Sequence, residues 1–258
     1  MIFVILLFVA SVITSVGAVI TTAESITQWY NRHYKWQEEE YGRLSTLRAG
    51  FLFQKFREQL GQPSYSAPLV KNFRQYTFQR RGYWVDAITN PGETVVAYAV
   101  TSCRSDFNPT FTYPAGGAHS RKMVLNKSTL SEILSGNSNV QKMRIAPAVA
   151  TNRAYVFIVL AGGNPTKYRQ FAAGMNDTCK WHSKGSKIPM VDAWAQWALE
   201  NPKPPGANTE TFDISALDRS ARVLAAQSIP NTYAETAPFV DILALYPDQI
   251  GVDRIAVR

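Results

Sequence analysis

Histidine and cysteine are scarce in this chain of 258 residues. The three histidines are His33, His119 and His182, and no serine or cysteine stands in the Gly-x-Ser-x-Gly pattern of a nucleophile elbow. Cys179 and His182 have the spacing of half a zinc site, but no second pair of ligands accompanies them. The sequence therefore predicts no catalytic residues, no metal site and no cofactor, and it favours a protein that is not an enzyme.

Acidic residues are almost missing from the middle of the chain. Between Phe107 and Met175 the only acid is Glu132, whereas eight residues of this segment are Lys or Arg. A local excess of positive charge suits an anionic lipid surface, or it marks a solvated face that repulsion keeps soluble. Nucleic acid is the less favoured partner, because the aromatic and cationic residues of the expected strand 73–79 more often cover a core than stack on bases.

The two cysteines, Cys103 and Cys179, leave two alternatives open. A disulfide between them is expected if the folded part is exported. Two reduced and buried thiols are expected if it faces the cytoplasm. The sequence does not decide between these alternatives.

The first twenty residues contain no charged residue and no proline. A helix of this length crosses a hydrocarbon layer of about 30 Å. We therefore predict a transmembrane helix over 1–23 and a single-pass protein of the bacterial inner (cytoplasmic) membrane. A cleaved signal peptide is the alternative, although the basic region that begins such peptides is missing. The nearest cations, Arg32 and Lys35, follow the span and favour a cytoplasmic soluble part.

The rest of the chain predicts an α+β fold class. A juxtamembrane helix is expected over 24–43, with an interruption at Gly42. An amphipathic helix is expected over 44–60, because Gly61 and Pro63 follow it as a stop signal. Two strands, 83–89 and 94–103, flank the turn signal Asn90-Pro91-Gly92-Glu93. Together they predict a first helix-plus-antiparallel-sheet unit over 44–120, which ends in a loop over 106–120.

A second α+β unit is predicted over 121–258. Thr129-Leu130-Ser131-Glu132 matches a capping box that opens a short helix. Strand-like runs follow over 140–145 and 154–160, so the pattern of the first unit recurs after about 80 residues. Helices over 189–200 and 213–227 then form a helical C-terminal section. The predicted fold is a transmembrane helix, two related helix-plus-antiparallel-sheet units and that section.

Two groups of residues are candidates for a pocket or an interaction surface. Gly163, Asn164 and Tyr168 follow an apolar strand, where a glycine pair brings backbone amides near a ligand or makes a simple strand-to-helix turn. Trp194 and Trp197 lie on the helix 189–200, where tryptophan either completes a core or contacts a protein partner.

Several segments carry a resemblance to a known family. They are Leu47-Arg48-Ala49-Gly50 to Leu60-Gly61-Gln62-Pro63, Tyr83-Trp84-Val85-Asp86-Ala87 to Ala99-Val100-Thr101, Gly163-Asn164-Pro165 with Tyr168 and Phe171, Asn231-Thr232-Tyr233, and Gly251-Val252-Asp253-Arg254-Ile255. In order and spacing they resemble the ETEC domain family, bacterial single-span membrane proteins without an established activity. This resemblance implies no catalytic residues.

The first of these segments also resembles the small outer-membrane-assembly lipoprotein fold of the BamE type. In that fold an Ala-Gly pair precedes the second helix and Leu-Gly-x-Pro closes it, and the unit is a docking module. The present chain has no lipobox cysteine near its N-terminus, which puts an outer-membrane destination in doubt.

These observations predict a membrane-tethered, non-catalytic binding or scaffolding module for a protein partner or an anionic lipid surface. The first alternative is an extracytoplasmic envelope-assembly factor with a disulfide between Cys103 and Cys179. The second alternative is a membrane-proximal hydrolase with its pocket near Asn164 and Tyr168.

Overall fold

The computed structural model describes residues 29–30, 35–114, 119–135, 140–148, 153–161, 169–176, 189–201, 211–212, 218–245 and 251. The chain divides into two compact units, Met1–Arg43 and Leu44–Arg258. Helix α2 (Trp36–Ser45) begins in the first unit and continues through Gly42, where the sequence predicted an interruption. In this helix the Glu40 carboxylate lies 3.7 Å from the Arg43 guanidinium, one turn further along the chain.

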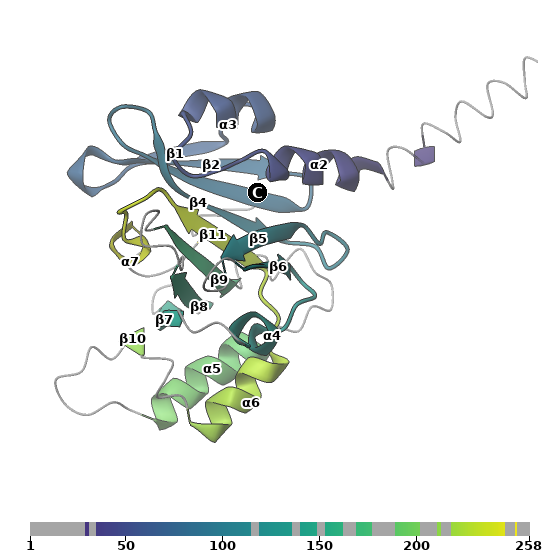
Figure 1. The fold of residues 1–258 in the computed structure, drawn as a ribbon, viewed down its shortest axis with the longest axis vertical. Helices are drawn as coiled ribbons and strands as arrows, with labels where there is room; N and C mark the ends of the chain where they lie inside the picture. Colours follow the sequence, from purple (N-terminus) through teal and green to yellow (C-terminus); the bar gives the residue numbers. More distant parts are fainter. Residues whose placement is uncertain are drawn as a thin grey trace, which may run out of the picture. The chain divides into compact units, whose positions relative to one another are not determined.

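The second unit is built on one antiparallel sheet, to which the described residues contribute nine strands. Their spatial order is β1 (Tyr65–Pro68), β2 (Arg74–Arg80), β3 (Tyr83–Thr89), β4 (Val95–Ser102), β11 (Thr232–Thr236), β9 (Gln170–Asn176), β8 (Arg153–Ala161), β7 (Val140–Ala148) and β10 (Thr211–Phe212). In Figure 1 this order begins at the end of the unit near α3 and finishes at the end near α5 and α6.

Strand β11 joins the two halves of this sheet. Glu235 of β11 lies opposite Tyr98 of β4 on one side and Phe171 of β9 on the other. A strand from near the C-terminus therefore completes a sheet whose halves come from the earlier parts of the chain. The prediction of two separate helix-plus-sheet units was wrong, because strands from both predicted segments hydrogen-bond to this shared central strand.

The predicted transmembrane helix is also contradicted. None of the helices in the described ranges is both long enough and apolar enough to cross a membrane. The predicted single-pass topology and inner-membrane location are therefore not supported, and neither is proposed for this protein. The predicted span itself, 1–23, lies outside the described residues.

The expected amphipathic helix over 44–60 is divided in the structure. Helix α2 ends at Ser45 and α3 (Phe53–Leu60) begins eight residues later. Between them the backbone pairs with the β3–β4 hairpin: the Gly50 N–H donates to the Val95 carbonyl at 2.7 Å, and the Phe53 N–H donates to the Glu93 carbonyl at 2.7 Å. These bonds take the place of helical ones. The predicted end at Gly61 is confirmed, since Gly61 has φ +85° and caps α3.

Helix α3 covers one face of the sheet with aromatic contacts. Phe53 stacks on Tyr76 of β2 with ring centroids 4.0 Å apart, and Phe56 meets Tyr98 of β4 edge to face at 5.4 Å. Phe56 is fully buried. Such aromatic pairs add about 0.5–1.5 kcal/mol to the stabilisation from burial. This aromatic face is the one that also carries Glu235, because Glu235 and Tyr98 lie directly opposite each other.

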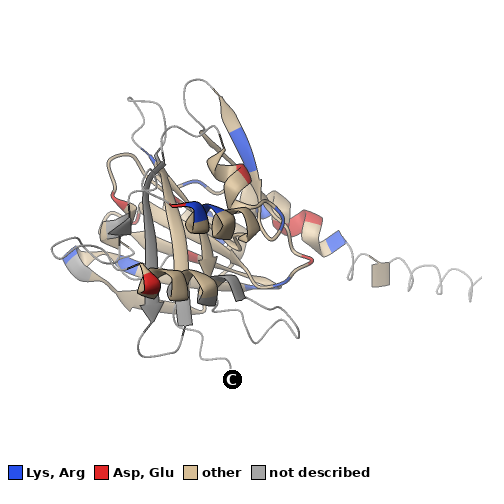
Figure 2. Ribbon diagram, turned by 90° about the horizontal axis from the view of Figure 1, so that it is seen from below, with Lys and Arg blue, Asp and Glu red and all other residues tan. Residues whose placement is uncertain are grey.

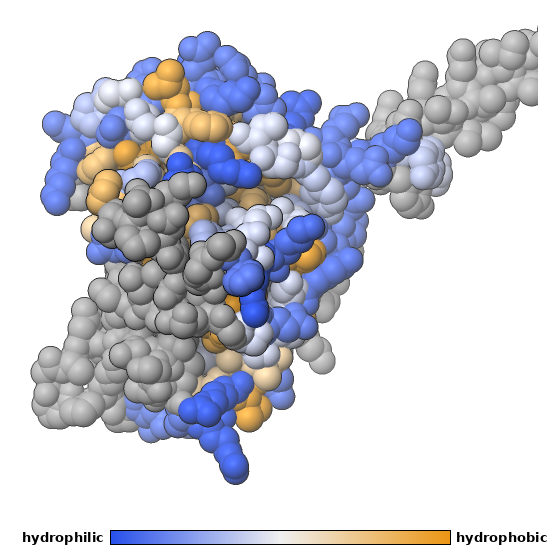
Figure 3. All heavy atoms as spheres, viewed as in Figure 1, coloured by the Kyte–Doolittle hydropathy of each residue, from blue (hydrophilic) through white to orange (hydrophobic). Residues whose placement is uncertain are grey.

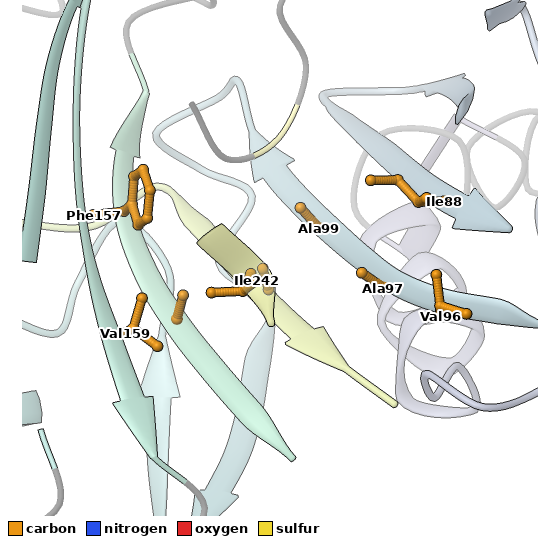
Figure 4. Packing of buried hydrophobic residues seen from close by; sticks show 9 residues of the cluster. Ile88, Val96, Ala97, Ala99, Phe157, Val159 and Ile242 are labelled. Atoms are coloured by element: carbon orange, nitrogen blue, oxygen red, sulfur yellow. The ribbon is translucent and has the colours of Figure 1, made fainter. Parts of the chain in front are cut away.

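The opposite face of the sheet carries a core cluster of mostly small and aliphatic side chains. Its core cluster, drawn in Figure 4, joins residues of β3, β4, β8, β9 and β11 with Ile242 of α7 (Ile242–Leu245). The members are Ile88, Val96, Ala97, Ala99, Phe157, Val159, Ala172, Ala234 and Ile242. Alanine at four of these places lets the backbone of covering segments approach closely, whereas the bulky partners fill the remaining space.

The loop predicted over 106–120 contains one strand of a second, two-stranded sheet. This sheet pairs β5 (Thr110–Pro114) with β6 (Ser120–Val124). Phe111 of β5 stacks on Tyr233 of the central strand, with ring centroids 4.1 Å apart and planes within 9°. The alternating buried Phe111 and Tyr113 make this segment a strand despite the Pro and Gly residues around it.

Three helices that follow the small sheet in the chain form one group. They are α4 (Leu130–Leu134), α5 (Pro189–Glu200) and α6 (Arg219–Gln227), with α6 in contact with both others; Figure 1 shows them together at one end of the unit. The capping box predicted for α4 is confirmed: the Glu132 N–H donates to Thr129 Oγ1, and the Thr129 N–H donates to the Glu132 carboxylate. One further short element, the 3-10 turn η2 (Val70–Asn72), precedes β2.

Charged residues of the described ranges are dispersed. In the view of Figure 2, lysines and arginines occur on several separate elements. Among the described residues on the face drawn in Figure 3, hydrophilic and hydrophobic areas are interspersed. Arg121 of the basic middle segment has structural partners, because its guanidinium donates to the Ser135 and Glu132 carbonyls at the end of α4.

Gly251 provides a test of close packing against the sheet. A Cβ atom at this residue would lie 2.5 Å from Thr101 Oγ1, and its φ of +90° favours glycine. We predict that Gly251→Ala lowers the free energy of unfolding by about 2–4 kcal/mol, measured by chemical denaturation. Gly42→Ala is the control: a Cβ there meets nothing within 4 Å, so we expect stability to be unchanged or raised by up to about 1 kcal/mol. Equal effects of the two substitutions would contradict this account.

Candidate functional site

An open groove lies between helices α5 and α6. It has a volume of about 780 Å³. Most of the surface area exposed in the groove is apolar, and charged residues also contribute to it. The lining residues are Ala193, Gln196, Trp197, Glu200, Asp218, Arg219, Ser220, Val223 and Leu224. Volumes of about 300–1,000 Å³ are typical of binding pockets in proteins. We call this site the α5–α6 groove.

A chain of hydrogen bonds fixes the indole of Trp197 in the α5–α6 groove. The Trp197 Nε1–H donates to Ser220 Oγ at 2.8 Å, and the Ser220 hydroxyl donates to Asp218 Oδ1 at 2.7 Å. Asp218 is the N-cap of α6, because the same oxygen accepts the Ala221 N–H at 2.8 Å. The bond from the Ala221 N–H has the larger effect and the bond from the Ser220 hydroxyl the smaller, and both hold the pKa of Asp218 below its usual value. The carboxylate therefore stays ionised at neutral pH.

Trp194 supports this arrangement from the core. It is fully buried, and its Nε1–H donates to Ser228 Oγ at 2.8 Å. Its ring meets that of Trp197 edge to face, with centroids 5.8 Å apart. The two indoles thus bind α5 to serines at both ends of α6, so the groove between the helices is preformed.

A second polar cluster lies inside the sheet, around Glu235. This side chain is 3% exposed, and its two oxygens have different partners. Oε1 accepts the Ala49 N–H at 2.7 Å and lies 3.6 Å from Arg169 Nη1, whereas Oε2 accepts the Tyr233 hydroxyl at 2.8 Å. Beside it, the buried Tyr98 hydroxyl donates to the Leu47 carbonyl at 3.3 Å. We call these residues, with Arg48, the Glu235 cluster.

Burial dominates the electrostatics of the Glu235 cluster. Removal from water raises the pKa of Glu235 above the ordinary value of 4.5, against the opposing effects of the Ala49 amide, the Tyr233 hydroxyl, Arg48 and Arg169. Burial, and then the charge of Glu235, raise the pKa of Tyr98 and of Tyr233 well above 10.0. Both phenols therefore remain protonated and keep donating their hydrogen bonds.

Comparison with known proteins adds nothing to this geometry. The chain matches no family model, no curated protein and no solved structure. The resemblance to the ETEC domain family and to the BamE-type fold therefore stays a prediction. The function has to be argued from the α5–α6 groove and the Glu235 cluster alone.

The structure distributes the predicted site residues over different places. Trp194 lies in the core and Trp197 in the α5–α6 groove. Gly163, Asn164 and Tyr168 lie outside the described residues, so the predicted pocket around them stays a prediction. Within the described part of the chain, no group of three or more His, Cys, Asp or Glu side chains is placed to hold a metal ion.

Cys103 is buried and disulfide-bonded. The other cysteine of the chain, Cys179, lies outside the described residues. The predicted pairing of Cys103 with Cys179 therefore stays a prediction.

Sequence reasoning missed the partners that give these sites their geometry. Asp218 with Ala221 three residues later is an N-cap signal, which could have moved the predicted start of α6 from 213 to 219. Among the partners of Glu235 in the described part of the chain, Tyr233 is near in sequence, and Ala49 and Arg169 are far away, so no local signal marks the cluster.

The Glu235 cluster predicts a large effect of one substitution. Glu235→Ala leaves the Ala49 N–H and the Tyr233 hydroxyl without their acceptor in a buried place, so we expect the free energy of unfolding to fall by about 2–4 kcal/mol. Chemical denaturation monitored by circular dichroism measures it. The control is Glu58→Ala on the exposed side of α3, where we expect a change below about 0.5 kcal/mol. If Glu235→Ala lowers the free energy of unfolding by less than about 1 kcal/mol, these buried bonds contribute little to stability.

Proposed function

We propose that this protein is a non-catalytic binding or scaffolding module that holds a protein partner in the α5–α6 groove. The observation that carries the proposal is the preformed groove with the fixed indole of Trp197 at its wall. An indole that is already held in place loses little conformational entropy when a partner packs against it. Tryptophan is also enriched among the residues that contribute most to protein–protein binding.

Two further features support a protein partner for the groove. Val223, which lines it, is 51% exposed, and Leu199, which precedes the lining residue Glu200 in the chain, is 74% exposed. Glu200, Asp218 and Arg219 supply charges of both signs beside this apolar surface. An apolar centre with a polar rim is the usual composition of a protein interface.

Site-specific photo-crosslinking tests this proposal in cells that express the full chain. We predict that a benzophenone amino acid at Gln196, on the exposed wall of the groove, gives a defined crosslinked product. The product should be lost in the Trp197→Ala variant, which removes the fixed aromatic wall. Ser220→Ala should weaken it, because the indole loses its hydrogen bond.

Two controls accompany this experiment. The same photoreactive residue at Glu58, on α3, reports nonspecific crosslinking at an exposed helix of the same unit. Circular dichroism of each variant shows whether it is folded. A Gln196 product that persists in folded Trp197→Ala, or that equals the product at Glu58, would contradict the proposed docking in the groove.

The disulfide bond of Cys103 favours a second candidate function, an extracytoplasmic envelope-assembly factor. Disulfides persist mainly in oxidising compartments, such as the bacterial periplasm, and they are rare in the cytosol. A binding module with such a bond would act on partners outside the cytoplasm. This candidate shares the α5–α6 groove with the first and differs in its location.

Differential alkylation of the cysteines tests the second candidate. We predict that Cys103 in acid-quenched, denatured cells resists alkylation until a reductant is added, because its sulfur is already bonded. Mass spectrometry of the peptide that contains Cys103 reads this out, and a cytosolic protein with buried thiols is the control for access under denaturation. Complete alkylation of Cys103 without reductant would rule out a stable disulfide in the cell and remove the argument for this location.

A further inference from the structure

The turn between α2 and α3 is attached to the middle of the sheet by one carboxyl group. This turn comprises residues 47–50, and its Ala49 is fully buried with its N–H bonded to Glu235 Oε1 at 2.7 Å. Glu235 lies on β11, the central strand. The turn is therefore held by a residue that is 186 positions away in sequence.

Other contacts position the same turn but do not titrate below neutral pH. The Gly50 N–H donates to the Val95 carbonyl, and the Leu47 carbonyl accepts the Tyr98 hydroxyl. Gly50 has φ +95°, which favours glycine and fixes the path of the turn. A change in the attachment at Glu235 thus acts on a turn that is otherwise well defined.

The two oxygens of Glu235 face donors of different kinds. A backbone N–H such as that of Ala49 only donates, whereas a hydroxyl such as that of Tyr233 donates or accepts. When the carboxyl is ionised, it accepts both bonds. When it is protonated, the proton belongs on Oε2, where it is donated to the Tyr233 oxygen, while Oε1 still accepts from Ala49. The Glu235 cluster thus accommodates a proton without releasing the turn.

We propose that Glu235 and the 47–50 turn form a proton-dependent latch, which closes more firmly when the carboxyl group is protonated and opens more readily when it is ionised. The physical reason is the cost of a buried charge. An ionised Glu235 gains hydration when the turn lifts away from the sheet, whereas a protonated Glu235 gains little. The ionised form therefore favours the open turn.

In the described part of the chain, the charged or titratable groups that face Glu235 are two arginines and two tyrosines. Arg48 on the turn and Arg169 before β9 favour the ionised form, but burial outweighs them, so the pKa of Glu235 in the closed state is raised. Tyr98 on β4 and Tyr233 on β11 have pKa values raised well above 10.0 and keep their protons. Glu235 is accordingly the group of this cluster whose protonation changes below the pH range in which the two tyrosines titrate.

The sign of the pH dependence follows from linkage. In the open turn the carboxyl group meets water, and its pKa returns toward the ordinary value of 4.5. The closed state thus binds the proton more tightly than the open state. Below the pKa of the open state, protonation favours closure to its full extent. As the pH rises through the higher pKa of the closed state, this contribution to closure is lost. If the pKa of Glu235 is one pH unit higher in the closed state than in the open state, the opening equilibrium differs about tenfold between low and high pH.

Amide hydrogen exchange of the full chain, followed by NMR, tests the latch. After correction for the intrinsic exchange rate at each pH, we expect the opening constant of the Ala49 amide to rise as the pH increases above 4.5 and passes through the raised pKa of Glu235. The amide of Ser135, which bonds the Ser131 carbonyl at the end of α4, is the internal control and should lack this profile. An opening constant for Ala49 that is constant, or that falls as pH rises, would overturn the proposal.

Two variants separate the latch from a purely structural role. Glu235→Gln imitates the protonated state, since its amide oxygen accepts from Ala49 and its NH₂ group donates to the Tyr233 oxygen. We expect it to fold and to abolish the pH dependence at Ala49. Tyr233→Phe removes a donor to Oε2, which raises the pKa of Glu235 further and moves the midpoint of the profile to higher pH.

A direct titration keeps the test decisive even if Glu235→Gln does not fold. The side-chain carboxyl carbon of Glu235 in the unmodified protein should titrate above pH 4.5. It should share its midpoint with the exchange profile of Ala49. A midpoint at or below 4.5, or an unchanged midpoint in folded Tyr233→Phe, would refute the latch. Because the α5–α6 groove is not involved, failure of the latch leaves the crosslinking result independent.

Discussion

The pairing of β11 with both β4 and β9 is the constraint on which the second unit depends. Tyr233 lies opposite Val100 on one side and Ala173 on the other, so backbone hydrogen bonds of this short strand connect the two halves of the sheet. Sheet stabilisation comes from such cross-strand neighbours. Without β11, the strands of each half would expose an unpaired edge, which proteins generally avoid.

Both faces of the sheet are adapted to this central strand. On one face Tyr233 stacks on Phe111 of β5, and Glu235 binds the Ala49 amide, so β11 organises a small sheet and a turn as well as its neighbours. On the other face Ala234 lies among the small residues of the core cluster. The buried carboxylate is costly in free energy unless its partners satisfy it. Those partners come from three separate parts of the chain, which makes the cluster specific to the complete fold.

The α5–α6 groove is independent of that cluster. Its shape depends on the two indole–serine bonds between the helices, and Trp194 and Trp197 have different roles in it despite being three residues apart. One helical turn separates a residue that fills the core from one that faces the groove. The helix that the sequence predicted over 189–200 has the same bounds in the structure, but its packing against α6 was needed to tell the two tryptophans apart.

The sequence by itself determined the elements whose signals are local. The hairpin around Asn90, the capping box at Thr129 and the end of α3 at Gly61 each depend on residues within a few positions, and all three are found in the structure. Only the tertiary structure decided the strands β9 and β11, because the alanines and glycine of β9 have little intrinsic preference for a strand and acquire one by pairing. The Glu235 cluster was hidden for the same reason: its bonds join distant segments, and no spacing in the sequence records them.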